Sequence, residues 1–198
     1  MPPKSKINPI DGRERIIQAA FSLFAERGFY GVSISDVAES AGLVKSSIYH
    51  HFESKEALYL AVLNETFDKI SAEMKANAVG KDWQTRLKGA IRALAQTMGP
   101  RSHALSLILE GITHTPTNAN RHKKDELRGK LLQVIATEIA QGIACGDLQA
   151  LDPTMTTTCL IGLIVSVLQA DQNWSEERRV DFAFNLFLKG ATRRASRK

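Results

Sequence analysis

Residues 33–58 read SISDVAESAGLVKSSIYHHFESKEAL, and this stretch decides the fold. Ser33 is a good helix N-cap, and Asp36 follows it at the capping-box spacing. Gly42 tolerates the left-handed conformation in which many helices end. Ser54 is a second N-cap candidate. The stretch therefore predicts a short helix that ends at Gly42, a tight turn, another short helix, and the start of a longer one.

The second short helix has an inward and an outward set of side chains. Ile48 and Phe52 lie four residues apart and predict an apolar anchor, while the small Ala38 lets the two short helices pack closely. The outward set is rich in hydrogen-bond donors, and a helix-turn-helix presents such a face to the major groove of DNA. The predicted DNA contacts are Lys45, Ser46, Ser47, Tyr49, His50 and, through a phosphate, Lys55.

Ala38 and Gly42 alone also fit any small helical bundle, because glycine stops are common. The whole string is more specific. AGLVKSSIYHHFESKEAL closely resembles the turn, the recognition helix and the next helix start of the TetR family of bacterial transcriptional repressors, and AAFSLFAERGFYGVSISDVAESAG resembles that family's first two helices. The matching positions include Gly42, Tyr49, His51, Phe52, Lys55 and Leu58.

This resemblance covers residues 11–60 and implies an all-α homodimer with a divergent ligand-binding body. It also implies that Ser33, Ser47, Tyr49, His50 and Lys55 contact DNA, mostly through its phosphates. We expect Tyr49→Ala and Lys55→Ala each to weaken DNA binding without lowering the melting temperature.

Val44 departs from the family pattern, which commonly has Ser or Thr before the recognition helix. Ser46 stands where the family often has Gly. Valine cannot cap a helix, so either the cap moves to Ser46 or Ser47, or the first N–H groups stay free for a phosphate.

Net charge does not locate a DNA-binding surface. The chain carries a formal charge of +5, but residues 1–60 hold seven basic and seven acidic residues. The excess lies in residues 121–130 and in the last six residues. A DNA face would therefore depend on where individual donors are placed.

Composition indicates an ordinary globular protein of 198 residues with a small head and a larger body. The longest apolar run, 159–168, is too short to span a bilayer. The N-terminus MPPKSKINPI lacks the apolar core of a signal peptide, so we expect a cytoplasmic location. Cys145 and Cys159 have no CxxC spacing, and both are predicted to be reduced core residues.

Apolar residues recur at three- and four-residue steps along the whole chain, and no alternating strand pattern is found. The expected fold is all-α, with about nine helices: a three-helix helix-turn-helix head and a helical ligand-binding and dimerisation body. The predicted sixth helix lies around residues 105–112. The predicted divisions are a disordered basic arm (1–10), a DNA-binding domain (11–60, motif 33–52), a ligand-binding and dimerisation domain (61–192) and a basic tail (193–198). The arm is either solvated or reaches a minor groove through Lys4 and Lys6.

The last two expected helices, which begin after Asp152 and Ser175, are apolar on more than one face. A helix that packs against a single core needs only one apolar stripe. The additional apolar faces of these two helices therefore favour a four-helix interface in a two-fold dimer. The alternative is that both helices lie centrally in a thick monomer core. The predicted interface residues are Leu160, Ile164, Val167, Phe182 and Leu186.

The body gives weaker signals for a small-molecule site. The pattern favours a largely apolar effector, although each apolar candidate also fits plain core. His103, His114 and His122 lack metal-ligand spacing, so neither a metal nor a cofactor is expected. The candidate effector residues are Trp83, Leu87, Ile91, His103, Leu107, Glu110, Leu131, Cys159 and Leu163.

No GxSxG, HExxH, GxGxxG or P-loop spacing occurs, so catalysis is not expected. The favoured function is a ligand-responsive DNA-binding transcriptional regulator, a repressor that binds a palindromic operator as a homodimer and is released by a small molecule. The alternative is a helical adaptor that binds only protein.

Overall fold

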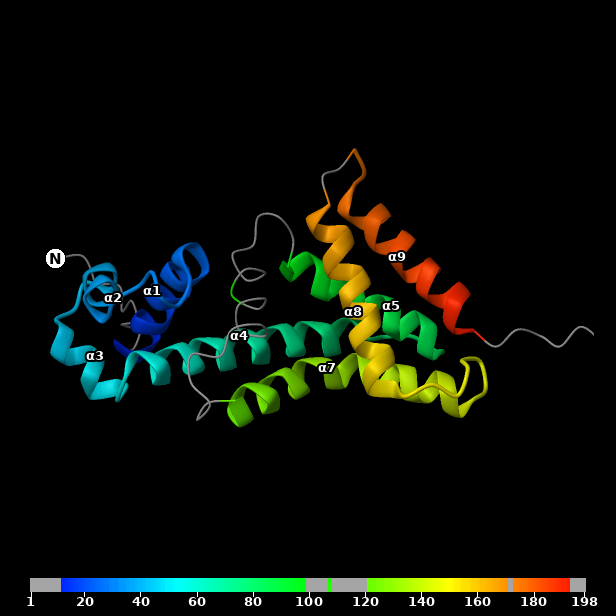
Figure 1. The fold of residues 1–198 in the computed structure, drawn as a ribbon, viewed down its shortest axis with the longest axis horizontal. Coiled ribbons are helices and arrows are strands. Elements are labelled where there is room, and N and C mark those ends of the chain that lie inside the picture. Colours follow the sequence, from blue (N-terminus) through cyan, green and yellow to red (C-terminus); the bar gives the residue numbers. More distant parts are fainter. Residues whose placement is uncertain (1–11, 99–106, 108–120, 171–172, 193–198) are drawn as a thin grey trace, which may run out of the picture. The chain divides into compact units, whose positions relative to one another are not determined.

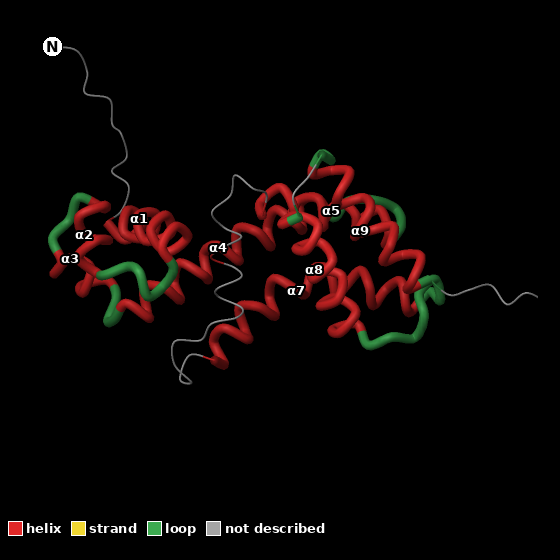
Figure 2. The backbone as a smooth tube through the Cα atoms, turned by 45° about the horizontal axis from the view of Figure 1, so that its top comes forward, coloured by secondary structure: helices red, strands yellow, loops and turns green. Residues whose placement is uncertain are grey.

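The computed structural model describes residues 12–98, 107, 121–170 and 173–192. Within these ranges the secondary structure is helical and Figure 2 shows no strand; a single isolated bridge pairs Leu148 with Thr192. The predicted all-α class is confirmed. The helices are α1 (Gly12–Arg27), α2 (Ile34–Ala41), α3 (Lys45–His51), α4 (Lys55–Asn77), α5 (Trp83–Met98), α7 (Arg121–Ala144), α8 (Pro153–Gln169) and α9 (Glu176–Ala191).

Several expectations fall outside the described residues. They are the arm, the tail, and the predicted sixth helix except for Leu107, which is buried. By contrast, the caps of the last two helices are confirmed. The Asp152 carboxylate accepts the backbone N–H of Met155 at 2.7 Å, and the Ser175 hydroxyl accepts that of Arg178 at 3.3 Å.

The chain divides into two compact units, Met1–Asn64 and Glu65–Lys198. The division falls within α4, which therefore begins in the first unit and ends in the second. We refer to the two units as the head and the body.

The head is built around an aromatic cluster. The Tyr59 ring meets Phe24 edge-on, with centroids 5.1 Å apart, and it meets Phe29 at the same centroid distance. All three side chains are at most 4% exposed. Helix α1 ends where Gly28 takes a positive φ of 68°, and this turn lets Phe29 fold back onto the cluster.

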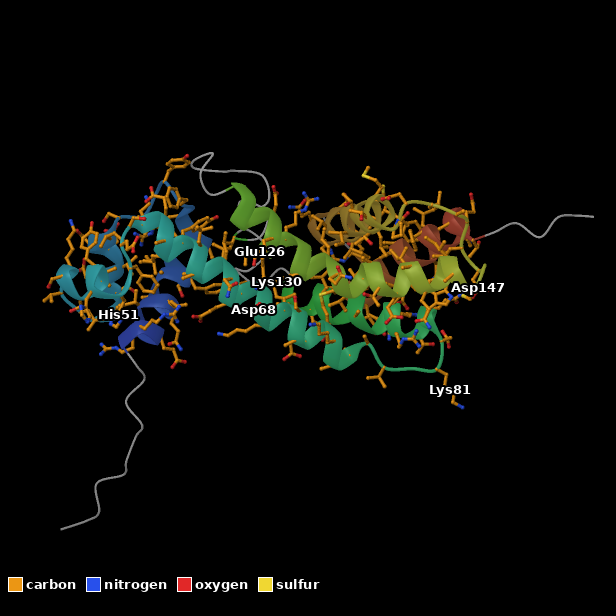
Figure 3. All side chains as sticks on the ribbon, turned by 90° about the horizontal axis from the view of Figure 1, so that it is seen from below. His51, Asp68, Lys81, Glu126, Lys130 and Asp147 are labelled. Atoms are coloured by element: carbon orange, nitrogen blue, oxygen red, sulfur yellow. The ribbon has the colours of Figure 1, made fainter. Side chains whose placement is uncertain are left out.

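In the body, α5 packs against α7 and α9, and α8 packs against α7 and α9 (Figure 1). The body part of α4 buries Phe67, Ile70 and Met74. Ion pairs add to the apolar core. Arg86 lies 2.8 Å from Glu138, and α7 reaches α4 through Lys130 and Asp68, whose side chains approach to 3.9 Å (Figure 3).

The end of α8 is capped by an arginine from α9. Arg179 is 7% exposed, and its Nη1 donates to the carbonyls of Val167 and Leu168, each at 3.0 Å. These carbonyls belong to the last turn of α8, which has no further intrahelical donors and carries the negative end of the helix dipole. The Arg179 guanidinium therefore links α9 to the C-terminal end of α8 through hydrogen bonds.

We expect Arg179→Met to lower the free energy of unfolding by about 2 kcal/mol, because charge-assisted hydrogen bonds to otherwise unpaired carbonyls are lost. Urea denaturation measures the change. Arg178→Met is the matched control. Arg178 is exposed and lies over the Trp174 ring at 4.2 Å, so its loss should cost less than about 1 kcal/mol. Equal losses in the two variants would contradict the capping role.

Both cysteines are exposed, so their prediction as core residues is wrong. Cys159 lies on the face of α8 that the body leaves uncovered, and Cys145 lies in the turn after α7. Among the described residues, no helix combines the length and apolar character needed to cross a bilayer.

Candidate DNA interface

The Ser33 cap starts α2 as predicted. The Ser33 hydroxyl accepts the Asp36 N–H at 3.2 Å, and the Asp36 carboxylate accepts the Ser33 N–H at 2.7 Å. This backbone bond, followed by the side-chain bond with Ser33, lowers the pKa of Asp36. The Ser33 side chain is exposed.

Gly42 makes the turn between α2 and α3. Its φ of 63° and ψ of 39° are left-handed. The Gly42 N–H bonds the Glu39 carbonyl at 3.0 Å, and the Leu43 N–H bonds the Ala38 carbonyl at 2.9 Å. Arg15 of α1 donates to the Ala41 carbonyl at 2.6 Å and ties the end of α2 to α1. The turn is thus held by the backbone and by a residue 26 positions earlier.

Helix α3 begins at Lys45, after Val44 as an N-cap without a side-chain hydrogen bond. Of the two alternatives for this start, the structure has the one without a serine cap. Ile48 is 0% exposed and Phe52 is 6% exposed, so the predicted inward pair is confirmed. The outward residues Lys45, Ser46, Tyr49 and His50 are exposed, with Tyr49 at 49%, and Ser47 is half-buried.

The ammonium group of Lys55 already has partners within the head. Its Nζ donates to the Val32 carbonyl at 2.7 Å and lies 4.2 Å from the centroid of the Phe29 ring. An ammonium group has three donors, so two remain for a phosphate. Lys55 therefore joins the start of α4 to the loop before α2, and this contact changes our expectation for its replacement.

We now expect Lys55→Met to weaken DNA binding and also to lower the free energy of unfolding by about 1 kcal/mol. Lys45→Met is the control. Lys45 is exposed at the start of α3, so its loss should weaken DNA binding and leave the melting temperature unchanged. Gel-shift titration and thermal unfolding together test the pair. An unchanged melting temperature for Lys55→Met would show that its contact with Val32 contributes nothing.

The head also exposes two residues that are not among the predicted DNA contacts. Tyr30, in the loop before Ser33, is 72% exposed, with its ring edge-on to Phe29 at 5.2 Å. His51, labelled in Figure 3, is exposed at the end of α3, and its ring lies 5.5 Å from that of His50. Neither lies in a periodic apolar stripe, so the sequence carries little signal for their placement.

The predicted effector residues that the structure describes lie in different surroundings. Leu87, Ile91 and Leu107 are 0% exposed core residues. Trp83 is buried, and its indole Nε1 donates to Asp147 at 2.8 Å. His103, Glu110 and the side chain of Leu131 lie outside the described residues. The remaining two predicted effector residues, Cys159 and Leu163, line a groove on α8 and α9.

The predicted interface residues split between core and surface. Leu160 and Ile164 are 0% exposed inside the body, so they present no surface to a partner, and Val167 is half-buried. Phe182 and Leu186 are 51% and 50% exposed. We call the exposed apolar set on α8 and α9 the outer face: Met155, Cys159, Phe182 and Leu186.

The outer face continues into a groove of about 450 Å³ lined mainly by apolar side chains, among them Met155, Leu163 and Leu186. Beside it, the Trp174 ring meets Phe182 edge-on at 5.7 Å. Exposed aliphatic and aromatic side chains gathered in this way are typical of a protein–protein contact.

Sequence comparisons identify the head. Residues 16–62 match the model of bacterial regulatory proteins of the tetR family. The HTH-type transcriptional repressor KstR2 of Mycolicibacterium smegmatis is 38% identical over 68 residues, which cover 34% of this chain and 33% of that protein. The HTH-type transcriptional regulator RutR of Escherichia coli is 31% identical over 145 residues, which cover 71% of this chain and 66% of RutR.

Solved structures share the fold across both units. FadR from Bacillus subtilis in complex with stearoyl-CoA has a TM-score of 0.77 at 20% identity, covering 89% of this chain and 97% of FadR. AibR in complex with isovaleryl coenzyme A and operator DNA has a TM-score of 0.75 at 21% identity, with the same coverage. The matched head, the helix-turn-helix geometry and the shared all-α fold agree, and the chain belongs to the TetR family of bacterial regulatory proteins.

Proposed function

We propose that the protein is a ligand-responsive DNA-binding transcriptional regulator that represses by binding a palindromic operator as a homodimer and is released by a small molecule. One observation carries the proposal. Helix α3 follows the turn at Gly42 and buries Ile48 in the core of the head. Its opposite face exposes Lys45, Ser46, Tyr49 and His50 to solvent. This is the geometry by which a recognition helix enters the major groove.

Phosphate contacts and base contacts are expected from different residues. Ser33, Tyr49 and Lys55 carry hydroxyl or ammonium donors suited to phosphates, and these contacts fix the position of the head on the duplex. Lys45, Ser46, Ser47 and His50 are then the candidates for reading base edges.

The homodimer is supported by the outer face. In a two-fold dimer the same patch meets its own copy, so exposed Phe182 and Leu186 would be covered by the partner's outer face. Two recognition helices would then contact half-sites about 34 Å apart, or a small multiple of that distance, and the operator would be a palindrome.

The effector is expected to be largely apolar, and the structural relatives suggest which compounds to test first. FadR was solved with stearoyl-CoA and AibR with isovaleryl coenzyme A. A coenzyme A thioester joins an apolar acyl chain to phosphates, and residues 121–130 hold five basic against two acidic residues. We therefore propose an acyl-CoA as effector, acting through unequal affinity for the free and the DNA-bound conformations.

We place the protein in the cytoplasm, with its DNA, and assign it no catalytic activity. The named relatives are transcriptional regulators. The competing proposal, a helical adaptor that binds only protein, predicts no salt-dependent affinity for any duplex.

Selection of bound sequences from a random DNA pool tests the proposal. We expect a palindrome to be enriched, with an affinity that falls steeply as salt is raised. Isovaleryl-CoA and stearoyl-CoA are then added to the complex, and one of them should release the DNA. Failure to enrich any sequence would overturn DNA recognition. Enrichment without release by either compound would overturn only the effector class.

A further inference from the structure

Val44 begins α3 in a way that sets this helix apart. Wherever else the structure describes the residue before a helix, the side chain of that residue accepts a backbone N–H of the first turn. These residues, at the starts of α2, α4, α5, α8 and α9, are Ser33, Ser54, Asp82, Asp152 and Ser175. Val44 makes no such bond. A serine there would stabilise α3, and a residue that breaks a local rule in this way is typical of a functional position.

The Val44 side chain is also exposed. Its exposed fraction is 67%, so it adds little to the core of the head. Among the described residues of the head, the other large apolar side chains that are exposed are Tyr30 and Tyr49, and each of these carries a hydroxyl group. Val44 has neither a donor nor an acceptor on its side chain. It can therefore contribute to binding only by burying apolar surface against a partner.

The backbone holds Val44 in a defined position. The Leu43 N–H donates to the Ala38 carbonyl at 2.9 Å, and the Val44 carbonyl accepts the Ser47 N–H at 2.9 Å. Val44 itself is extended, with a φ of −87° and a ψ of 151°. Because valine is branched at Cβ, its side chain has few rotamers. The two methyl groups therefore lose little conformational freedom when a partner covers them.

The partner at this place on a helix-turn-helix is the edge of a base pair. The first residues of a recognition helix contact base edges in the major groove. Thymine displays a C5-methyl group there, whereas the other groups on the base edges are hydrogen-bond donors and acceptors. Lys45 and Ser46, which follow Val44 and are exposed, can bond such donors and acceptors. Val44 can discriminate between bases only through the methyl group.

We propose, on the basis of the DNA-binding function proposed above, that Val44 determines operator specificity by packing against the C5-methyl group of a thymine in each half-site. This contact adds an apolar element to a face whose other predicted contacts are hydrogen bonds and charges. It also accounts for an exposed valine at a position where a serine would stabilise the helix.

The test uses the duplex enriched from the random DNA pool. Each thymine of one half-site is replaced in turn by deoxyuridine, which lacks the C5-methyl group and keeps every donor and acceptor. At one position we expect the Kd from gel-shift titration to rise about four-fold, the effect of exposing one methyl group. An enriched duplex in which no replacement raises the Kd would overturn this inference alone. Failure to enrich any duplex would overturn the proposed DNA recognition as well.

Variants of Val44 assign the effect to this side chain. Val44→Ala and Val44→Ser both remove the methyl groups, and each should bind the thymine and the deoxyuridine duplex equally well. The serine variant should also have a higher melting temperature, because serine can cap α3. Its lost discrimination would then not be a consequence of unfolding. Val44→Ile should still discriminate, because isoleucine keeps an apolar branched side chain.

Val79→Ala is the matched control. Val79 is 72% exposed in the loop between α4 and α5, so its loss removes the same groups from the surface of the body. This variant should keep the four-fold difference between the two duplexes. Discrimination that persists in Val44→Ala or in Val44→Ser would show that another side chain contacts the thymine methyl group, and it would overturn the proposal.

Discussion

Substitution of both Phe182 and Leu186 by glutamate is expected to leave the protein monomeric and to remove operator binding. Both side chains are half exposed, so the change removes little from the core of the body. Across a two-fold interface it would place four carboxylates in an apolar contact, where unpaired charges are strongly unfavourable. Loss of the second recognition helix should weaken operator binding at least about 100-fold, because the second contact is then no longer intramolecular.

Light scattering gives the mass of the variant, and gel-shift titration gives its affinity. The control adds the same charges elsewhere, through Gln133→Glu and Ala140→Glu on the exposed side of α7. This control should remain dimeric and bind DNA. If the Phe182 and Leu186 variant stays dimeric, the interface lies away from the outer face.

Gly42→Val is the second change with a large expected effect. A β-branched residue is strongly disfavoured at a φ of 63°, and the added Cβ would lie 3.1 Å from the Arg15 Nη2 that holds the end of α2. We expect the free energy of unfolding of the head to fall by about 2 kcal/mol. Because the turn sets where α3 begins, operator binding should become undetectable in gel-shift titrations.

Gly146→Val is the control, because it introduces similar backbone strain at a glycine outside the candidate DNA interface. Gly146 also has a positive φ, of 81°, but nothing lies within 4 Å of an added Cβ, and it belongs to the turn after α7. Its variant should lose stability and keep operator binding. Gly42→Asn should recover part of both properties, since asparagine tolerates the left-handed region. Normal DNA binding by Gly42→Val would show that the turn does not set the recognition helix.

The local features of this fold were predictable from the sequence. Ser33, Asp152 and Ser175 cap helices because an N-cap bond joins residues only two or three positions apart. The inward pair Ile48 and Phe52 follows from helical periodicity in the same way. These inferences need no knowledge of what packs against the helix.

Other features depend on residues far apart in the chain, and for these features the predictions from sequence are wrong. Helices α8 and α9 are apolar on two faces, and periodicity does not say which face turns inward. The sequence pattern therefore predicts Leu160 and Ile164 at a partner contact although they lie in the core, and it predicts Cys159 in the core although it is exposed. The sequence predicts no loss of stability when Lys55 is replaced, because its acceptor, Val32, lies 23 positions earlier.

Because Cys159 is exposed on the outer face, the rate at which its thiol is modified can show whether two outer faces are in contact. If two outer faces meet, a thiol reagent should modify Cys159 slowly in the dimer and quickly in the Phe182 and Leu186 variant. Cys145, exposed in the turn after α7, lies off the outer face and should react at the same rate in both proteins. The ratio of labelling at the two thiols then measures self-association within a single sample, with one cysteine serving as the internal standard for the other.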